Sequence, residues 1–192
     1  MAAGRVILLV GPSCAGKSTM ARAIQETAAE PFVCQSLDGL FANVPERWGG
    51  SGDERDAGFH YIFEGEVRRI GYGPVGWRML QGFHRAAAAH ARAGINVVVD
   101  DMLLGDACLA DWAEALAGLE VLLVRLIAPL TELARREAAR ERRRTPGLAA
   151  GHYELHAGLS ADLVIDTSLA PPDEAAARVL GFQPASALIL GH

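Results

Sequence analysis

The stretch GPSCAGKS, residues Gly11–Ser18, decides the fold, because it matches the pattern G-x-x-x-x-G-K-[S/T] at every specified position. The apolar run Val6–Val10 precedes it, and a helical pattern over 18–28 follows it. A buried strand, a glycine-rich turn and a helix in this order form a loop whose backbone N–H groups and helix N-terminus hold phosphate groups. The sequence therefore predicts a phosphate-binding loop at the C-terminal end of the first strand.

Two side chains of this loop carry chemistry of their own. Lys17 would reach the β- and γ-phosphates as a point charge, and the hydroxyl group of Ser18 would bind the Mg²⁺ that bridges them. Lys17 is also the only lysine among the 18 basic residues of the chain. The alternative is a glycine-rich turn that binds nothing. The residues of this segment that we expect to hold ATP are Gly11, Pro12, Ser13, Cys14, Ala15, Gly16, Lys17, Ser18 and Thr19.

Composition narrows the class of protein further. The chain has 192 residues, and no apolar run reaches the length of about 18 residues that spans a bilayer. Its net charge of −5 argues against general binding of nucleic acid. Its three cysteines have no CxxC spacing, which argues against disulfides and structural zinc. We expect a single cytoplasmic domain over residues 1–192, with no membrane or nucleic-acid partner.

Strands and helices alternate along the chain. Apolar, β-branched runs predict strands at 6–10, 32–36, 95–99, 121–127 and 163–165. Helical patterns predict helices at 18–28, 74–92, 106–117, 129–144, 148–155 and 173–180. An acceptor-side insertion over about 43–72 is expected to contain a loop and a small hairpin, with strands at 61–63 and 67–70. The alternation indicates an α/β fold, a three-layer sandwich around a parallel sheet.

Carboxylates are expected at the edge of the sheet where ligands bind, beyond the C-terminal ends of the strands. Asp100 directly continues the strand 95–99 and is, with Ser18, an expected Mg²⁺ ligand, while Asp101 would point toward the acceptor or cap the following turn. Asp38 follows the second strand, where a carboxylate can accept the proton of an attacking hydroxyl group. Asp38 could instead be the N-cap of the helical turn that follows it.

The basic residues cluster in one predicted helix, over 129–144. Arg136, Arg140 and Arg143 fall at i, i+4 and i+7, which places three guanidinium groups on one stripe of that helix. Such a stripe suits triphosphate oxygens and the charge that develops during phosphoryl transfer. The alternative is a solvated helix with Glu–Arg pairs. Because a Thr-Pro-Gly stop follows, we expect the segment 129–158 to form an arginine-rich lid.

Histidines and aromatic residues carry a weaker signal. His156 lies near the C-terminal end of the expected lid and could touch substrate. No partner pattern is visible for His60, His84, His90 and His152. An apolar acceptor pocket could be lined by aromatic side chains that in most proteins simply belong to the core, namely Trp48, Phe59, Tyr61, Phe63 and Trp77.

Taken together, these segments resemble the chloramphenicol phosphotransferase family. The resemblance runs from Val6 to about Ser168 and is carried by the phosphate loop, Ser36-Leu37-Asp38-Gly39-Leu40, Gly73-Pro74, residues 93–101, the arginine helix, Tyr153 and His156-Ala157-Gly158. It implies a fold like that of nucleoside monophosphate and shikimate kinases, with five parallel strands in the order 2-3-1-4-5. It also implies an alcohol as the acceptor and Asp38 as the general base. Little can be matched between Asn43 and Gly71, where the family builds much of its acceptor pocket.

The function that these features favour is transfer of the γ-phosphoryl group of ATP to a hydroxyl group of a small molecule, with Mg²⁺ as the second cofactor. We expect an antibiotic such as chloramphenicol, or a related secondary metabolite, as the acceptor. The expected catalytic residues are Lys17, Asp38, Arg136 and Arg140, and the nucleotide would also be bound by Arg136, Arg140 and Arg143. One alternative is a kinase acting on shikimate, gluconate or a nucleotide. Another is a nucleotide-hydrolysing switch protein.

Overall fold

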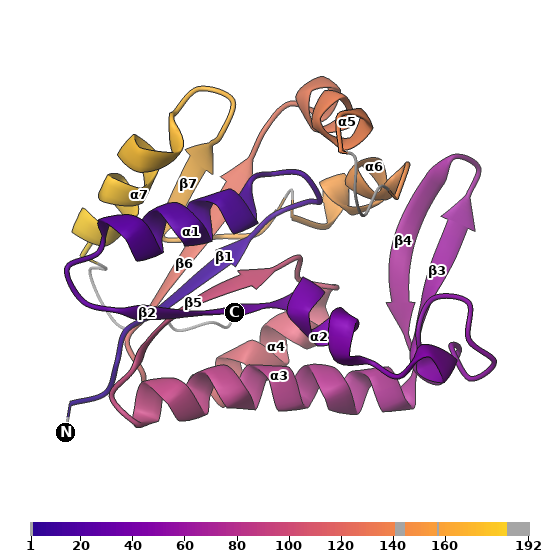
Figure 1. The fold of residues 1–192 in the computed structure, drawn as a ribbon, viewed down its shortest axis with the longest axis horizontal. Helices are drawn as coiled ribbons and strands as arrows, with labels where there is room; N and C mark the ends of the chain where they lie inside the picture. The colour runs from indigo at the N-terminus through magenta and orange to yellow at the C-terminus, as the bar shows by residue number, and fades with distance from the viewer. Residues whose placement is uncertain (1, 141–144, 157, 184–192) are drawn as a thin grey trace.

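The computed structural model of the chain describes residues 2–140, 145–156 and 158–183. Its centre is a sheet of five parallel strands, in the order β2-β5-β1-β6-β7 (Figure 1). The bounds of these strands are β1 (Val6–Val10), β2 (Phe32–Ser36), β5 (Asn96–Asp101), β6 (Val121–Ile127) and β7 (Leu163–Asp166). Each of the five predicted strands is therefore present, and each is parallel to its neighbours. The labels differ from the expected order 2-3-1-4-5 because the two strands of a separate hairpin lie between β2 and β5 in the chain.

Helices cover both faces of the sheet, so that three layers form (Figure 1). Helices α1 (Lys17–Thr27) and α7 (Pro172–Gly181) lie on one face, and α3 (Pro74–Arg92) and α4 (Asp106–Ala115) lie on the other. No helix within the described ranges is both long and apolar enough to cross a bilayer.

Alternate residues of β1 supply the two hydrophobic cores. Leu8 packs in the core beneath α3 and α4, while Ile7 and Leu9 pack in the core beneath α1 and α7. All five residues of β1 are fully buried. Such a strand must be apolar on both faces, which is why its sequence is a continuous apolar run instead of an alternating one.

The segment after β6 differs from the prediction. The single helix expected over 129–144 ends as α5 (Leu130–Ala138), and α6 (Leu148–Tyr153) follows it. The carboxylate of Glu137 accepts hydrogen bonds from the backbone N–H groups of Gly147 and Ala149, at 2.8 and 2.9 Å, and therefore caps α6. A long straight helix would carry Glu137 away from these groups. Arg140 therefore lies beyond the end of α5, and the predicted helical stripe is wrong.

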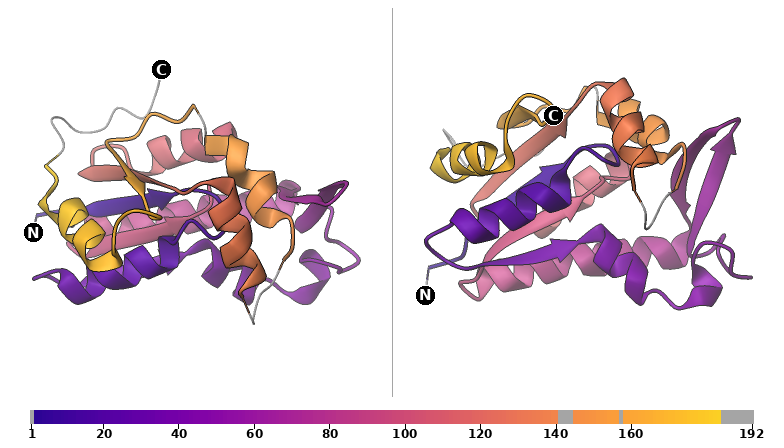
Figure 2. Two further views of the ribbon diagram at one scale, coloured as in Figure 1. Left: turned by 90° about the horizontal axis from the view of Figure 1, so that it is seen from above. Right: turned by 45° about the horizontal axis from the view of Figure 1, so that its top comes forward.

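The hairpin expected near residues 61–70 is confirmed and is longer than predicted. Its strands β3 (Phe59–Glu64) and β4 (Val67–Tyr72) are antiparallel and form a sheet of their own. The hairpin stands beside α6 at one edge of the molecule (Figures 1 and 2). The shorter elements that complete the chain are α2 (Leu37–Asn43) and the 3₁₀ turns η1 (Glu46–Trp48) and η2 (Glu154–His156).

Close backbone contacts join the hairpin to α6. The N–H group of Arg68 donates to the carbonyl oxygen of Gly147 at 3.1 Å. A Cβ atom at Gly151 would lie 1.8 Å from the carbonyl oxygen of Arg68, far inside van der Waals contact. Only glycine fits at this position, so the sequence of α6 is shaped by the strand that it contacts.

We expect Gly151→Ala to lower the free energy of unfolding by about 1–3 kcal/mol, because the added methyl group meets backbone atoms that cannot move aside freely. The matched control is Gly82→Ala in α3, where no atom lies within 4 Å of the place that the added Cβ atom would take. That substitution should stabilise the protein by up to about 1 kcal/mol through helix propensity. Urea unfolding of both variants measures the difference, and equal stabilities would contradict the packing described above.

Candidate active site

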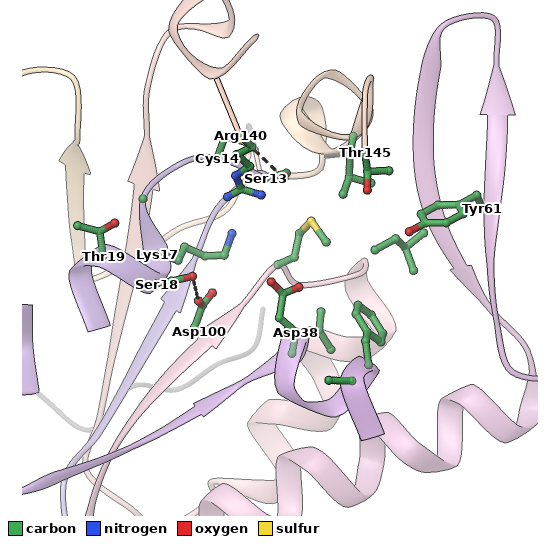
Figure 3. Close-up of a pocket in the computed structure, with 17 residues that line it drawn as sticks. Ser13, Cys14, Lys17, Ser18, Thr19, Asp38, Tyr61, Asp100, Arg140 and Thr145 are labelled. Atoms are coloured by element: carbon green, nitrogen blue, oxygen red, sulfur yellow. Dashed lines mark hydrogen bonds between the residues drawn. The ribbon is translucent and has the colours of Figure 1, made fainter. Parts of the chain in front are cut away.

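A cavity of about 430 Å³ lies at the C-terminal edge of the sheet and is called the reaction cavity below. The candidate catalytic and metal-binding residues that line it are Lys17, Ser18, Asp38, Asp100 and Arg140. Other residues that the sequence singled out and that line it are Ser13, Cys14, Gly16, Thr19 and Tyr61. Figure 3 shows Lys17, Ser18 and Asp100 on one wall, with Asp38 facing them and Tyr61 further across. The structure thus brings together residues from three strand ends and from the segment after α5.

The phosphate loop has a backbone that its glycines make possible. Gly16 has a φ of +90°, and a Cβ atom at Gly11 would lie 2.4 Å from the carbonyl oxygen of Leu126. Cys14 also has a positive φ, of 66°, which is unusual for a residue with a side chain. The loop wraps the N-terminus of α1, so its N–H groups and the helix dipole point to the same place.

Lys17 is held inside the loop. Its Nζ atom donates to the carbonyl oxygens of Gly11 and Pro12, at 2.9 Å each, and its side chain is buried. Burial lowers the pKa of Lys17, and the negative charge of Asp100 opposes that shift. A second source of negative charge in the cavity would favour the charged ammonium form further.

Ser18 and Asp100 form a hydrogen-bonded pair at the end of β5. The Ser18 hydroxyl group donates to Oδ2 of Asp100 at 2.6 Å. Burial raises the pKa of Asp100, and the charge of Lys17 opposes this shift. Both side chains offer oxygen atoms, which are the ligands that Mg²⁺ prefers. Across the described residues, no group of three or more His, Cys, Asp or Glu residues is placed to hold a metal, so phosphate oxygens and water would complete the coordination of such an ion.

Asp101 does not point toward the acceptor, which corrects that expectation. It is buried, and it accepts hydrogen bonds from the backbone N–H of Leu103 at 2.9 Å and from Nε1 of Trp112 at 2.6 Å. Asp101 therefore fixes the turn after β5 and the packing of α4. The prediction that it caps the following turn was correct, but its contact with Trp112 was not foreseen.

Asp38 lies in the first turn of α2, but it does not cap that helix. The N-cap is Ser36, whose Oγ atom accepts from the N–H of Gly39 at 3.0 Å. The alternative interpretation of Asp38 as an N-cap is therefore wrong. The carboxylate of Asp38 instead points into the reaction cavity, toward the wall that carries Lys17 and Asp100 (Figure 3).

The arginines of the predicted stripe have different environments. Arg136 donates to Thr167 Oγ1 and to the Thr167 carbonyl oxygen, at 2.9 and 3.0 Å, and more weakly to the carbonyl oxygen of Cys14 at 3.3 Å. It therefore ties α5 to the phosphate loop. Arg140 is exposed and reaches the reaction cavity from beyond the end of α5. Arg143 lies outside the described residues.

Thr167 is a site residue that the sequence reasoning missed. Its Oγ1 atom lies 3.0 Å from the carbonyl oxygen of Ala15, and it lines a second cavity of about 270 Å³ between the phosphate loop and α7. Arg136 and Arg140 line the same cavity, which is called the nucleoside cavity below. Its position in the sequence could have indicated this role, because Thr167 follows the strand predicted at 163–165, at the edge where such sheets bind ligands.

A third, apolar cavity of about 360 Å³ adjoins the reaction cavity and is called the hairpin cavity below. Phe41, Tyr61 and Ile70 line both. Of the five aromatic residues considered from sequence, Phe59 and Tyr61 line the hairpin cavity. The other three lie elsewhere: Trp77 stacks on Tyr72, Trp48 lies under the guanidinium of Arg47, and Phe63 is exposed near the hairpin tip.

Comparison with known proteins gives a consistent family match. Residues 4–183 match the family model described as chloramphenicol phosphotransferase-like protein. A protein of Mycobacterium tuberculosis, provisionally named an O-phosphotransferase, is 31% identical over 185 residues. The match covers 92% of this chain and 80% of that relative.

Solved structures of kinases share the fold at low identity. An APS kinase of Mycobacterium tuberculosis, solved with AMPPNP and APS, has a TM-score of 0.66 at 16% identity, covering 94% of this chain and 97% of that chain. A gluconokinase of Sinorhizobium meliloti has a TM-score of 0.61 at 21% identity, and the match covers 94% of this chain and 91% of that chain. A tunicamycin resistance protein of Deinococcus radiodurans has a TM-score of 0.62 at 17% identity, and the match covers 95% of this chain and 99% of that chain.

We expect Thr167→Val to weaken the binding of Mg²⁺-AMPPNP by about tenfold, the factor that corresponds to one net hydrogen bond. The substitution removes the hydroxyl group that links Arg136 to the phosphate loop while it keeps the branched shape. Thr131→Val, at an exposed position of α5, is the control. Isothermal titration calorimetry measures both variants, and an unchanged dissociation constant for Thr167→Val would show that this link does not support the nucleotide site.

Proposed function

This chain belongs to the chloramphenicol phosphotransferase-like family, and we propose that it transfers the γ-phosphoryl group of ATP to an antibiotic, such as chloramphenicol, or to a related secondary metabolite. It is a kinase with a hydroxyl group of a small molecule as its acceptor. The observation that carries the proposal is the reaction cavity, in which Asp38 faces the side chains of Lys17, Ser18 and Asp100.

The triphosphate of ATP would lie in the phosphate loop. Backbone N–H groups of residues 13–18 would surround its oxygens, and the Nζ atom of Lys17 would exchange its two carbonyl partners for phosphate oxygens. The nucleoside would occupy the nucleoside cavity, beside Thr167 and Arg136. Arg140 lines this cavity and the reaction cavity, so it would contact the phosphates at the point of transfer.

Mg²⁺ would be held by Ser18 and by Asp100, either directly or through water. When bound, the ion neutralises charge that builds on the phosphate oxygens during transfer. The hydrogen bond between the two side chains orients both of them before the ion arrives. Binding of the ion would require ionised Asp100, which the nearby charge of Lys17 favours.

Asp38 would act on the acceptor. Its carboxylate would accept a hydrogen bond from the acceptor hydroxyl group, align that oxygen with the γ-phosphorus, and take the proton as the new O–P bond forms. Lys17 and Arg140 would stabilise the charge on the transferred group from the opposite wall. Arg136 would contribute less directly, because most of its donors already bind Thr167, Glu132 and the loop.

The hairpin cavity favours a neutral acceptor with an apolar part. Among its described lining residues there is no lysine or arginine, the charged residue is Glu46, and His60 also lines it. The apolar and aromatic lining residues are Phe41, Val44, Phe59, Tyr61 and Ile70. Anionic acceptors such as gluconate, shikimate or a nucleotide need cationic contacts to replace lost water. Among the described residues on the acceptor side of the site, few are cationic.

Mass spectrometry of reactions with MgATP and a panel of hydroxyl-bearing antibiotics, chloramphenicol included, tests the proposal. We expect one acceptor to gain the mass of one phosphate in the presence of the wild-type protein. Lys17→Ala should abolish this gain, because the substitution removes the charge that holds the transferred phosphate. Steady release of ADP with no modified acceptor would favour a nucleotide-hydrolysing switch, and modification of gluconate or shikimate alone would favour the metabolite kinase.

Asp38→Asn should lower kcat for a phosphorylated acceptor by about 10²–10⁴-fold, the usual effect of losing a general base. The KM for ATP should change little, because Asp38 lies across the cavity from the phosphate loop. Asp106→Asn, at an exposed position in the first turn of α4, is the matched control. If Asp38→Asn retained kcat within a few-fold, the assignment of the base would be wrong.

A further inference from the structure

Two buried histidines lie behind one wall of the reaction cavity, and the proposed reaction does not use them. This wall contains Ile70, Met102 and Leu148 and is called the acceptor wall. His152 lies near the C-terminus of α6 and is fully buried, and His156 in η2 is 3% exposed. Buried polar side chains of this kind cost stability unless their hydrogen bonds are satisfied. The partners of the four ring nitrogens therefore indicate what these residues hold in place.

The partners of His152 fix its protonation. Its Nε2 atom accepts a hydrogen bond from the backbone N–H of Ile70 in β4, at 3.3 Å. Its Nδ1 atom lies 3.1 Å from the carbonyl oxygen of Leu148 and must donate, since a carbonyl cannot. The ring is therefore neutral, with its proton on Nδ1. Burial, which lowers the pKa of His152 to about 4, is consistent with this form.

His156 continues the same chain of contacts. Its Nε2 atom lies 2.6 Å from the carbonyl oxygen of Met102, in the segment that follows β5. Its Nδ1 atom faces a second carbonyl oxygen, that of His152, at 3.2 Å. A neutral imidazole carries one proton, so it donates to only one of these two carbonyl oxygens. The shorter contact places a proton on Nε2, donated to Met102.

We propose that His152 and His156 are positioning residues for the acceptor, because their rings hold the backbones of Ile70, Leu148 and Met102. These three residues line the reaction cavity, and they come from three separate elements of the chain. The ring of His152 joins β4 to α6, and the ring of His156 joins η2 to the segment after β5. That this wall contacts an acceptor rests on the proposed function. That the two histidines hold the wall rests on the contacts described above.

The histidines act on the acceptor side and not on the nucleotide side. Each of the four ring contacts goes to Ile70, Leu148, Met102 or the other histidine, and none goes to the phosphate loop. The junction around them also contains the hydrogen bond from Nε of Arg69 to the carbonyl oxygen of Gly151 and the backbone hydrogen bond from Arg68 to Gly147. Loss of the histidines should therefore loosen the acceptor wall and leave nucleotide binding intact.

His152→Phe and His152→Gln test this inference as a pair. Phenylalanine keeps a ring of similar size and removes both nitrogens, whereas the glutamine amide retains an acceptor for the N–H of Ile70. Hydrogen exchange followed by mass spectrometry reports on the peptide 59–72, and titration with Mg²⁺-AMPPNP reports on the nucleotide site. We expect exchange in this peptide to be about tenfold faster in His152→Phe, with nucleotide affinity within twofold of wild type, and His152→Gln to lie closer to wild type.

Kinetics give the second readout. With an acceptor found in the panel, His152→Phe should raise the acceptor KM by about tenfold and leave the ATP KM unchanged. His90→Gln, toward the far end of α3, is the control. Three results would overturn the positioning role. They are unchanged hydrogen exchange in the peptide 59–72, faster hydrogen exchange throughout the chain, and a rise of the KM values for both acceptor and ATP. If no acceptor is phosphorylated, the proposed function fails. The hydrogen-exchange rates and the affinity for Mg²⁺-AMPPNP then still decide whether these residues hold the wall.

Discussion

The pairing of β1 with β5 on one side and β6 on the other is the constraint on which the rest of the structure depends. Its register places Leu9 of β1 beside Asp100 of β5. Because the strands are parallel, the phosphate loop, Asp100 and the start of α2 all emerge at one edge of the sheet. The hydrogen bond between Ser18 and Asp100 therefore follows from this register together with the phosphate loop, which connects β1 to the start of α1.

The same edge gathers buried charge, which has to be compensated. Burial shifts the pKa of Lys17 down and that of Asp100 up, and each residue opposes the shift of the other. Carbonyl oxygens of the loop satisfy the ammonium, and Ser18 satisfies the carboxylate. These partners are weaker than a triphosphate and a divalent cation. The polar groups of the site are thus arranged in advance for ligands with the opposite charges, which is the arrangement that electrostatic catalysis requires.

The elements that the sequence predicted well are those whose signal is local. The apolar runs, the G-x-x-x-x-G-K-S motif and the long helix α3 follow from neighbouring residues alone. The early end of α5 was missed because Glu137 caps a helix ten residues further along the chain. Thr167 and the partners of His152 and His156 were missed for the same reason, since these contacts join residues between 31 and 152 positions apart in the chain.

The proposed acceptor side and the phosphate side are built from different parts of the chain. The phosphate loop, Asp100 and Thr167 belong to the sheet edge, whereas the hairpin, α6 and η2 form a wall fastened by its own contacts. Sequence change in that wall can alter the shape of the hairpin cavity without disturbing the pairing of Ser18 with Asp100. Kinases as different as APS kinase and gluconokinase share this fold at 16% and 21% identity, so the fold alone does not select an acceptor. The proposed acceptor wall is the part of this chain that we expect to make that selection.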